Sequence, residues 1–227
     1  MKRYLRVVGK SIWLLFLLLS ICKLSSSQDF TFKNKKHKLG FDVGYGAQNF
    51  AMALSKINEN DAKKISDFFG IDEDSGLDVN YFYEVFFFQL QYYYTLSSSR
   101  TMAFELLLQP QYNRTSFRQK DHAVEKTDGY EYGMNIGFLA RKNMFRDFLS
   151  FYVAISSGPH YVSGTPTRQA SGFIFSSNFF GGMNIRFLRN VYLDIRPGFR
   201  HISNANLKHP NHGINNLVIN TGLFIAL

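Results

Sequence analysis

Apolar and polar residues alternate with a period of two near the C-terminus. Over residues 191–200 the odd positions are apolar, whereas the even positions include Asp194 and Arg196. A second alternating segment, 215–227, follows a polar stretch at 204–213. Because successive side chains of a β-strand point to opposite faces, this period is typical of a strand whose two faces meet different surroundings. The end of the chain therefore predicts two strands joined by a polar loop.

Six further segments show the same alternation, so the sequence predicts an all-β protein. The eight predicted strands lie at about residues 39–48, 80–95, 101–112, 130–140, 149–157, 173–187, 191–203 and 215–227. Strands of about ten residues can cross a bilayer when tilted. Longer or polar connections near residues 50, 114, 158 and 204 alternate with tight ones. This is the plan of an eight-stranded antiparallel transmembrane β-barrel of the outer-membrane type, with short turns and both termini in the periplasm.

The chemistry of the two faces separates this barrel from a soluble, lipocalin-like barrel, which also has eight strands. Charged residues such as Glu105, Glu131 and Arg196 share their face with Gly133 and Gly198. Glycine suits the narrow interior of a small barrel, so we expect the polar face to line the lumen. Unpaired charges there would be costly, and we therefore expect a paired network. The apolar face would then contact lipid.

The N-terminus predicts a secretory signal peptide over residues 1–27, with the barrel occupying 28–227. Basic residues precede an apolar run at 12–19, and three serines follow it. Residues 1–27 hold five basic residues and no acidic ones, so their removal lowers the net charge from +9 to 21 − 17 = +4. This leaves no basic surface that would indicate nucleic-acid binding. The basic cluster at 33–38 is interpreted as a solvated leader, and the lone Cys22 excludes an intramolecular disulfide.

The candidate chemistry lies at the end of the seventh predicted strand. Continuing the parity places His201 and Ser203 on the apolar, outward face at the level of the outer-leaflet headgroups, and Asn215 shares that face on the last strand. A hydroxyl, a base and a group that orients the base form a candidate triad. Hydrogen-bond donors for an oxyanion are expected from three loop residues: Asn204, Asn211 and the backbone at Gly213.

No cofactor and no metal is expected. His209 and His212 lie close together in the loop, but no third ligand follows at a suitable spacing.

The string 201–205, HISNA, followed by 210–213, PNHG, resembles the C-terminal signature of the lipid A 3-O-deacylase (PagL-type) family. The resemblance implies an outer-membrane barrel that removes the ester-linked acyl chain at position 3 of lipid A, with lipopolysaccharide of the outer leaflet as its partner. It also implies roles for individual residues: His201 as base, Ser203 as nucleophile, and Asn204 and Asn211 near the oxyanion. The family's acidic residue falls twelve positions after the serine, where this chain has Asn215.

Two hypotheses follow for the function. The first is a serine esterase acting on lipid A, in which Asn215 orients the imidazole without supplying a charge. The second is a non-catalytic outer-membrane barrel with a degenerate site and a structural or surface-interaction role. Glu84 is a remote substitute for the missing carboxylate, because the first strand is expected to separate it from the last.

Overall fold

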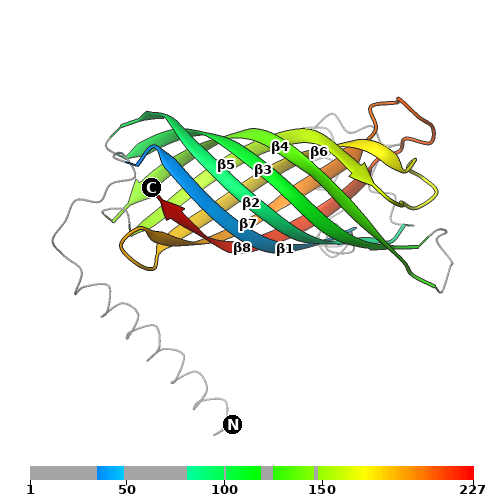
Figure 1. Ribbon diagram of the computed structural model, residues 1–227, viewed down its shortest axis with the longest axis horizontal. Coiled ribbons are helices and arrows are strands. Elements are labelled where there is room, and N and C mark those ends of the chain that lie inside the picture. The colour runs from blue at the N-terminus through cyan, green and yellow to red at the C-terminus, as the bar shows by residue number, and fades with distance from the viewer. Residues whose placement is uncertain (1–34, 49–80, 100, 119–124, 146–147) are drawn as a thin grey trace, which may run out of the picture. The chain divides into compact units, whose positions relative to one another are not determined.

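The protein forms a closed barrel of eight strands (Figure 1). The computed structural model describes residues 35–48, 81–99, 101–118, 125–145 and 148–227, so the predicted signal peptide lies outside the described residues. The strands are β1 (His37–Ala47), β2 (Tyr83–Ser98), β3 (Met102–Phe117), β4 (Thr127–Met144), β5 (Leu149–Val162), β6 (Gly172–Arg186), β7 (Val191–Ser203) and β8 (Ile214–Ala226). Within the described ranges, no helix is long and apolar enough to cross a membrane.

Every strand pairs antiparallel with its neighbour in sequence, and β8 pairs with β1 to close the sheet. The closing register runs from Lys38 opposite Ala226 to Ala47 opposite Leu217. Closure leaves no edge strand with unpaired backbone groups, which a sheet surrounded by lipid cannot tolerate. The predicted all-β, eight-stranded antiparallel fold is confirmed.

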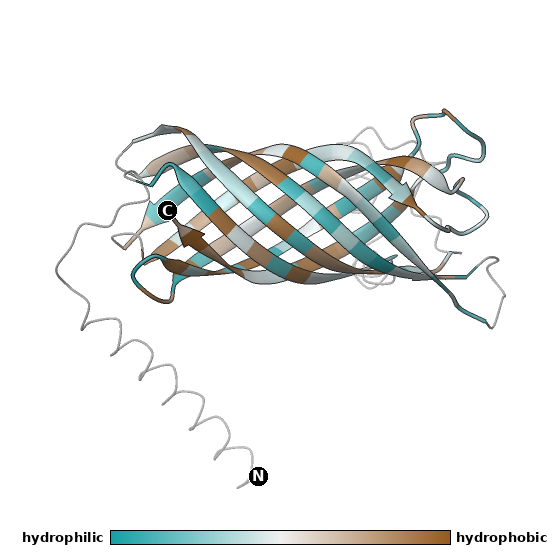
Figure 2. Ribbon diagram, viewed as in Figure 1, coloured by the Kyte–Doolittle hydropathy of each residue, from teal (hydrophilic) through white to brown (hydrophobic). Residues whose placement is uncertain are grey.

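The outer face of the wall is apolar, as the alternating bands of hydropathy along each strand show (Figure 2). Ile155, Phe86 and Leu223 are 57%, 53% and 51% exposed, and most other outward residues are also large and apolar. Water would make such a continuous surface costly, whereas hydrocarbon suits it. Tyr132 stacks on Tyr161 near the ends of β4 and β5, with ring centroids 5.5 Å apart, as in an aromatic girdle. The apolar face therefore points outward, contrary to a lipocalin-like barrel.

The lumen is filled by a polar network. At the end of the barrel that holds the short turns, Glu105 accepts a hydrogen bond from Lys38 at 2.5 Å and one from Arg141 at 2.8 Å. All three side chains are buried. The interpretation of 33–38 as a solvated leader is thus wrong for Lys38. Lys38 is the second residue of β1, which begins at His37, and its side chain points into the lumen. There its positive charge offsets the negative charge of Glu105.

Two further ion pairs continue the network through the barrel. Arg196 pairs with Asp42, and Arg200 pairs with Glu131. All four side chains are buried, which confirms the expectation of a paired lumen. Such buried pairs depend on one another, since removing one partner leaves an uncompensated charge.

Strands β3, β4 and β5 extend further than predicted at the end that holds the long connections, whereas β2 begins at Tyr83, three residues later than predicted. β3 continues to Phe117 and β4 begins at Thr127, so the connection predicted over 113–128 is only 118–126. β5 likewise continues to Val162, beyond the loop expected from residue 158. In β3 the inward side chains Asn113 and Thr115 are polar like their outward neighbours, which hides the alternation from a hydropathy pattern. The barrel wall thus rises beyond its apolar belt.

Candidate active site

Two of the predicted site residues meet on the outer face of the barrel. His201 in β7 lies opposite Asn215 in β8. The ring nitrogen Nδ1 of His201 is 2.7 Å from Asn215 Oδ1. An amide oxygen can only accept a hydrogen bond, so Nδ1 carries the proton and Nε2 is left as the basic nitrogen. The pair therefore holds the ring in the tautomer that a general base needs.

Ser203 ends β7, two residues beyond His201 on the same face. Residues two apart in a strand point the same way, so the hydroxyl and the imidazole face a common space. Ser203 is partly exposed and lies opposite Phe175 of β6. Within the described part of the chain, neither Ser203 Oγ nor His201 Nε2 has a hydrogen-bond partner. Both atoms are thus available to each other or to a substrate.

Gly213 packs against the imidazole from the loop between β7 and β8. Its φ is +68°, a conformation that favours glycine. A Cβ at this position would lie 2.5 Å from His201 Cε1 and 3.2 Å from His201 Nε2. The absence of a side chain thus lets the backbone of Gly213 approach the imidazole ring. The N–H of Gly213, predicted as an oxyanion donor, donates to Gln169 Oε1 at 3.1 Å.

The two predicted asparagines organise the same loop. The backbone N–H of Asn204 donates to Asn211 Oδ1 at 2.8 Å. Asn204 Nδ2 donates to the carbonyl oxygen of Lys208 at 2.6 Å, and Asn211 Nδ2 donates to Asn206 Oδ1 at 2.9 Å. A side-chain amide carries two N–H groups, so each asparagine keeps one further donor. Asn211 is partly exposed, whereas Asn204 is buried.

Residues that the sequence did not single out hold this arrangement from neighbouring loops. Tyr81, just before β2, clamps the backbone of Asn215: its hydroxyl accepts from the N–H at 2.8 Å and donates to the carbonyl at 3.2 Å. Arg168 lies over the Tyr81 ring, with Cζ 4.4 Å from its centroid, and donates to the carbonyl of His212 at 3.1 Å. Gln169 forms an isolated bridge with Asn211. Three connections therefore converge on one site, and no local periodicity marks these long-range partners.

Glu84 does not reach the candidate triad. It accepts a hydrogen bond from Tyr45 at 2.8 Å and forms an ion pair with Lys126 at 3.3 Å. In the register, Ala47 of β1 lies between Glu84 of β2 and Leu217 of β8. The first strand thus separates this carboxylate from β8, as expected from the sequence.

A sequence model of the PagL lipid A 3-O-deacylase family matches residues 73–224, which include His201, Ser203 and Asn215. The chain belongs to the PagL family. No curated protein matches the chain significantly. This family membership confirms the resemblance drawn from the loop that follows Ser203.

The crystal structure of the enzyme PagL shows the same fold as this family member. The crystal structure of the outer-membrane enzyme PagL has 15% sequence identity and a TM-score of 0.53, and the match covers 84% of this chain and 99% of that one. The crystal structure of Neisserial surface protein A matches with 12% identity and a TM-score of 0.45, over 85% of this chain and 97% of that one. At such identities the likeness to PagL is one of fold alone.

Proposed function

We propose that this protein is an outer-membrane serine esterase that removes the acyl chain ester-linked at position 3 of lipid A. The observation that carries the proposal is the His201–Asn215 hydrogen bond on the outward face, two residues from a serine hydroxyl. An esterase site on that face opens sideways to lipid and not into the filled lumen. Family membership supplies the substrate class.

The proposed reaction uses Ser203 Oγ and His201 Nε2, which have no hydrogen-bond partner among the described residues. Ser203 Oγ attacks the ester carbonyl carbon while its proton passes to His201 Nε2. The tetrahedral intermediate then expels the sugar oxygen, which takes the proton from the imidazolium, and the acyl chain remains on Ser203. Water repeats the sequence, giving up a proton to His201 and releasing a fatty acid. Every proton that leaves a nucleophile is thus returned to a leaving oxygen.

The oxyanion donors in this proposal are the amide groups of the loop 204–213. Asn211 is the best placed of them, because its side chain is partly exposed and one of its Nδ2–H groups is uncommitted. Asn204 contributes chiefly by holding Asn211 in place. The Gly213 N–H can turn to an oxyanion only when its bond to Gln169 opens.

Asn215 limits the rate of the proposed reaction. Its amide orients the imidazole but cannot compensate the imidazolium charge that forms during attack. The corresponding acid-to-amide change in a serine protease costs about 10⁴ in rate, chiefly because it leaves the imidazole in the wrong tautomer. Here Nδ1 already donates to Asn215 Oδ1, so the penalty from the missing charge is smaller than that figure. We therefore propose a slow esterase, limited by the charge and not by the alignment of its base.

The topology supports an orientation in the membrane. We propose that residues 1–27 direct secretion and are then removed. We also propose that the short turns face the periplasm, together with the N- and C-termini of the mature barrel. The long connections, and with them Ser203, then reach the outer leaflet, where lipid A resides. The end of the chain, marked C, lies at the same end of the barrel as the short turns (Figure 1).

A non-catalytic barrel is the second candidate, and the amide at position 215 favours it. In that case His201 and Ser203 are rim residues, and the protein has a structural or surface-interaction role. The two candidate functions share one fold, but only the esterase releases a product from lipid A.

Mass spectrometry of lipid A separates the candidates. Purified barrel is refolded with lipid A in mixed micelles, beside a Ser203→Ala variant. The esterase predicts loss of one ester-linked acyl chain with wild type and none with the variant. Intact lipid A in both samples, with both barrels folded, would establish the non-catalytic candidate instead.

A further inference from the structure

A row of polar side chains crosses the outer face beside the candidate site. His201 in β7 lies opposite Ser177 in β6, and Ser177 lies opposite Ser157 in β5. The hydroxyl oxygens of Ser157 and Ser177 are 2.9 Å apart, and both side chains are exposed. Together with Asn215, these residues form one continuous polar row over four neighbouring strands.

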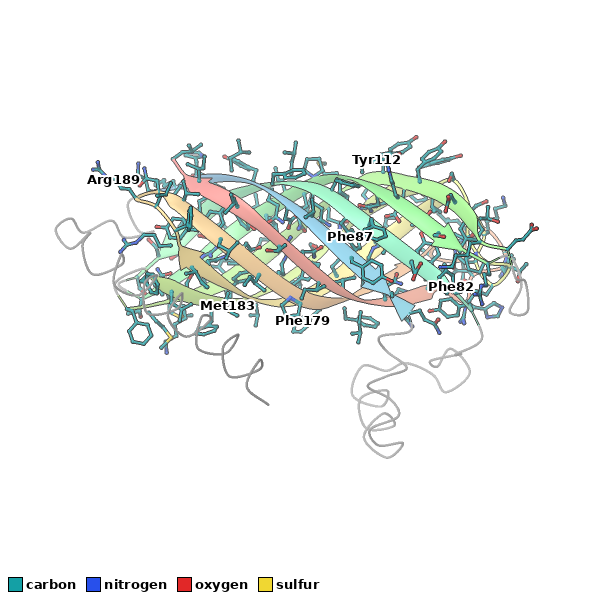
Figure 3. The ribbon with its side chains drawn as sticks, turned by 90° about the horizontal axis from the view of Figure 1, so that it is seen from below. Phe82, Phe87, Tyr112, Phe179, Met183 and Arg189 are labelled. Carbon is teal, nitrogen blue, oxygen red and sulfur yellow. The ribbon has the colours of Figure 1, made fainter. Side chains whose placement is uncertain are left out.

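The surroundings of this serine pair are apolar. Ile155 and Phe179, one outward position below it on the two strands, are 57% and 48% exposed. Figure 3 shows Phe179 projecting from the wall on the outer side. On the other side of the pair lie Pro159 and Phe175, which face each other across the same two strands. Apolar side chains therefore flank the serine pair on both sides along β5 and β6.

The pair has one hydrogen-bond donor in excess. Two hydroxyls carry two hydrogens, and the bond between them uses one. Among the residues that the structure describes, no acceptor takes the other. A hydroxyl in an apolar medium without a partner costs free energy, and a polar atom on a neighbouring lipid would recover it.

The pair is within reach of the reacting atoms. Directly opposed side chains in an antiparallel sheet have Cβ atoms about 5 Å apart, and diagonal neighbours are about 7–8 Å apart. Ser177 is directly opposite His201 and diagonal to Ser203. A group bound by the serine pair would thus lie a few bonds from an ester carbonyl at Ser203.

We propose that Ser157 and Ser177 form a specificity subsite that binds a hydroxyl group carried by the substrate's acyl chain close to its ester. This inference rests on the proposed esterase function and deepens it. The serine pair donates its spare O–H to the substrate hydroxyl and accepts in return, so that a hydroxylated chain is aligned with Ser203. An unsubstituted chain leaves the donor unpaired and binds less well.

Two synthetic lipid A analogues test the subsite, identical except for a hydroxyl on the chain to be cleaved. Wild type should cleave the hydroxylated analogue with a kcat/KM about tenfold higher, the size of effect expected for one hydrogen bond. Ser177→Ala and Ser157→Ala should lower that preference to near unity, while Ser177→Thr, which keeps the hydroxyl, should retain it. Thr221→Ala removes an exposed outward hydroxyl at a distance from the site and should leave the preference unchanged.

A binding measurement keeps the subsite testable without turnover. The Ser203→Ala barrel is mixed with each analogue in micelles, and retained lipid is measured by native mass spectrometry. Preferential retention of the hydroxylated lipid, lost in Ser203→Ala/Ser177→Ala, supports the subsite even if wild type cleaves neither analogue. That last result would count against the esterase alone.

Three results would overturn the subsite. The first is equal cleavage and equal retention of the two analogues by the unaltered pair. The second is a uniform loss on both analogues in the alanine variants, which indicates a structural role. The third is a change of oligomeric state in those variants, which makes the pair a contact between copies of the chain.

Discussion

His160 in the lumen and His201 on the outer face each hold ring nitrogen Nδ1 against a side-chain oxygen. The distance is 2.6 Å from His160 to Glu131 Oε1 and 2.7 Å from His201 to Asn215 Oδ1. The two geometries are nearly the same. They differ in charge, because only Glu131 is a carboxylate.

The two histidines also differ in what their other nitrogen meets. His160 Nε2 lies 3.0 Å from both Gln111 and Asn135, and Glu131 is shared with Arg200. Both ring nitrogens of His160 are thus engaged by side chains of the lumen network. His201 Nε2 has no such partner within the described residues. An oriented imidazole is therefore structural when both nitrogens are bound, and chemically competent when one is left open.

The largest expected effect comes from removing the open nitrogen or its hydroxyl partner. His201→Ala and Ser203→Ala should each lower the rate of lipid A deacylation by roughly 10²-fold to 10⁶-fold, because a complete triad is worth about 10⁶ as a unit and the amide at position 215 already forfeits part of it. His209→Ala, in the exposed loop, is the matched control and should retain full activity. Rates are measured by release of fatty acid, and folding by heat-modifiable migration on gels. Full activity in His201→Ala would end its role as the base.

A carboxylate at position 215 would give His201 the charged partner that His160 already has in Glu131. This change should raise the rate of deacylation. Asn215→Glu is expected to accelerate deacylation, with the roughly 10⁴-fold acid-to-amide penalty as an upper bound, because that penalty includes a change of tautomer that does not arise here. Asn215→Gln has the same length as the glutamate variant and no charge, so the ratio of the two isolates the electrostatic contribution. Equal rates for these two variants would show that charge at this position does not limit the reaction.

Removing the carboxylate of Glu131 from the lumen network should destabilise the barrel. Glu131→Gln leaves Arg200 buried without its carboxylate, and the free energy of unfolding should fall by about 3–5 kcal/mol. The control is Glu84→Gln, whose partner Lys126 is 47% exposed, and this surface pair should contribute only about 0–1 kcal/mol. Urea titration of both variants in liposomes measures the difference. A similar small loss in the two variants would contradict the assigned role of the lumen network.

A smaller effect is expected at the contact that positions the His201 ring. Gly213→Ala would place a methyl group against Cε1 and should lower kcat about tenfold to a hundredfold by displacing the ring. Gly172→Ala carries the same type of backbone strain at φ +104°, with nothing within 4 Å of the added carbon. It should therefore lose stability without losing kcat. If both variants lose kcat equally, strain and not the ring contact explains the effect.

Much of this fold follows from parity alone. A period of two assigns each side chain to the lumen or to lipid, and so it brings out eight strands and the shared face of His201 and Ser203. It cannot find the ends of strands where both faces are polar, as at Asn113 and Thr115. Burial of Lys38 was also missed, since its partner Glu105 is 67 positions away and belongs to another strand.

The sequence likewise predicts one part of the candidate site, the strand residues, and not the contacts between connections that support them. The strand residues His201, Ser203 and Asn215 follow from alternation and from the resemblance to the PagL family. The clamp of Tyr81 on Asn215 and the bond of Gln169 to Gly213 join different connections, and no local pattern reports such contacts. Sequence reasoning therefore identified the candidate chemistry but not its support.

Labelling of Ser203 tests directly whether this residue is a nucleophile activated by His201. Trypsin cleavage after Arg200 and Lys208 releases a peptide, 201–208, whose only serine is Ser203. Folded barrel is treated with a long-chain fluorophosphonate, which forms a stable bond with an activated serine, and the digest is read by mass spectrometry. If His201 activates Ser203, the peptide carries an adduct in wild type, is labelled faster in Asn215→Glu, and is not labelled in His201→Ala. An unmodified peptide from wild type that still deacylates lipid A would contradict this activation.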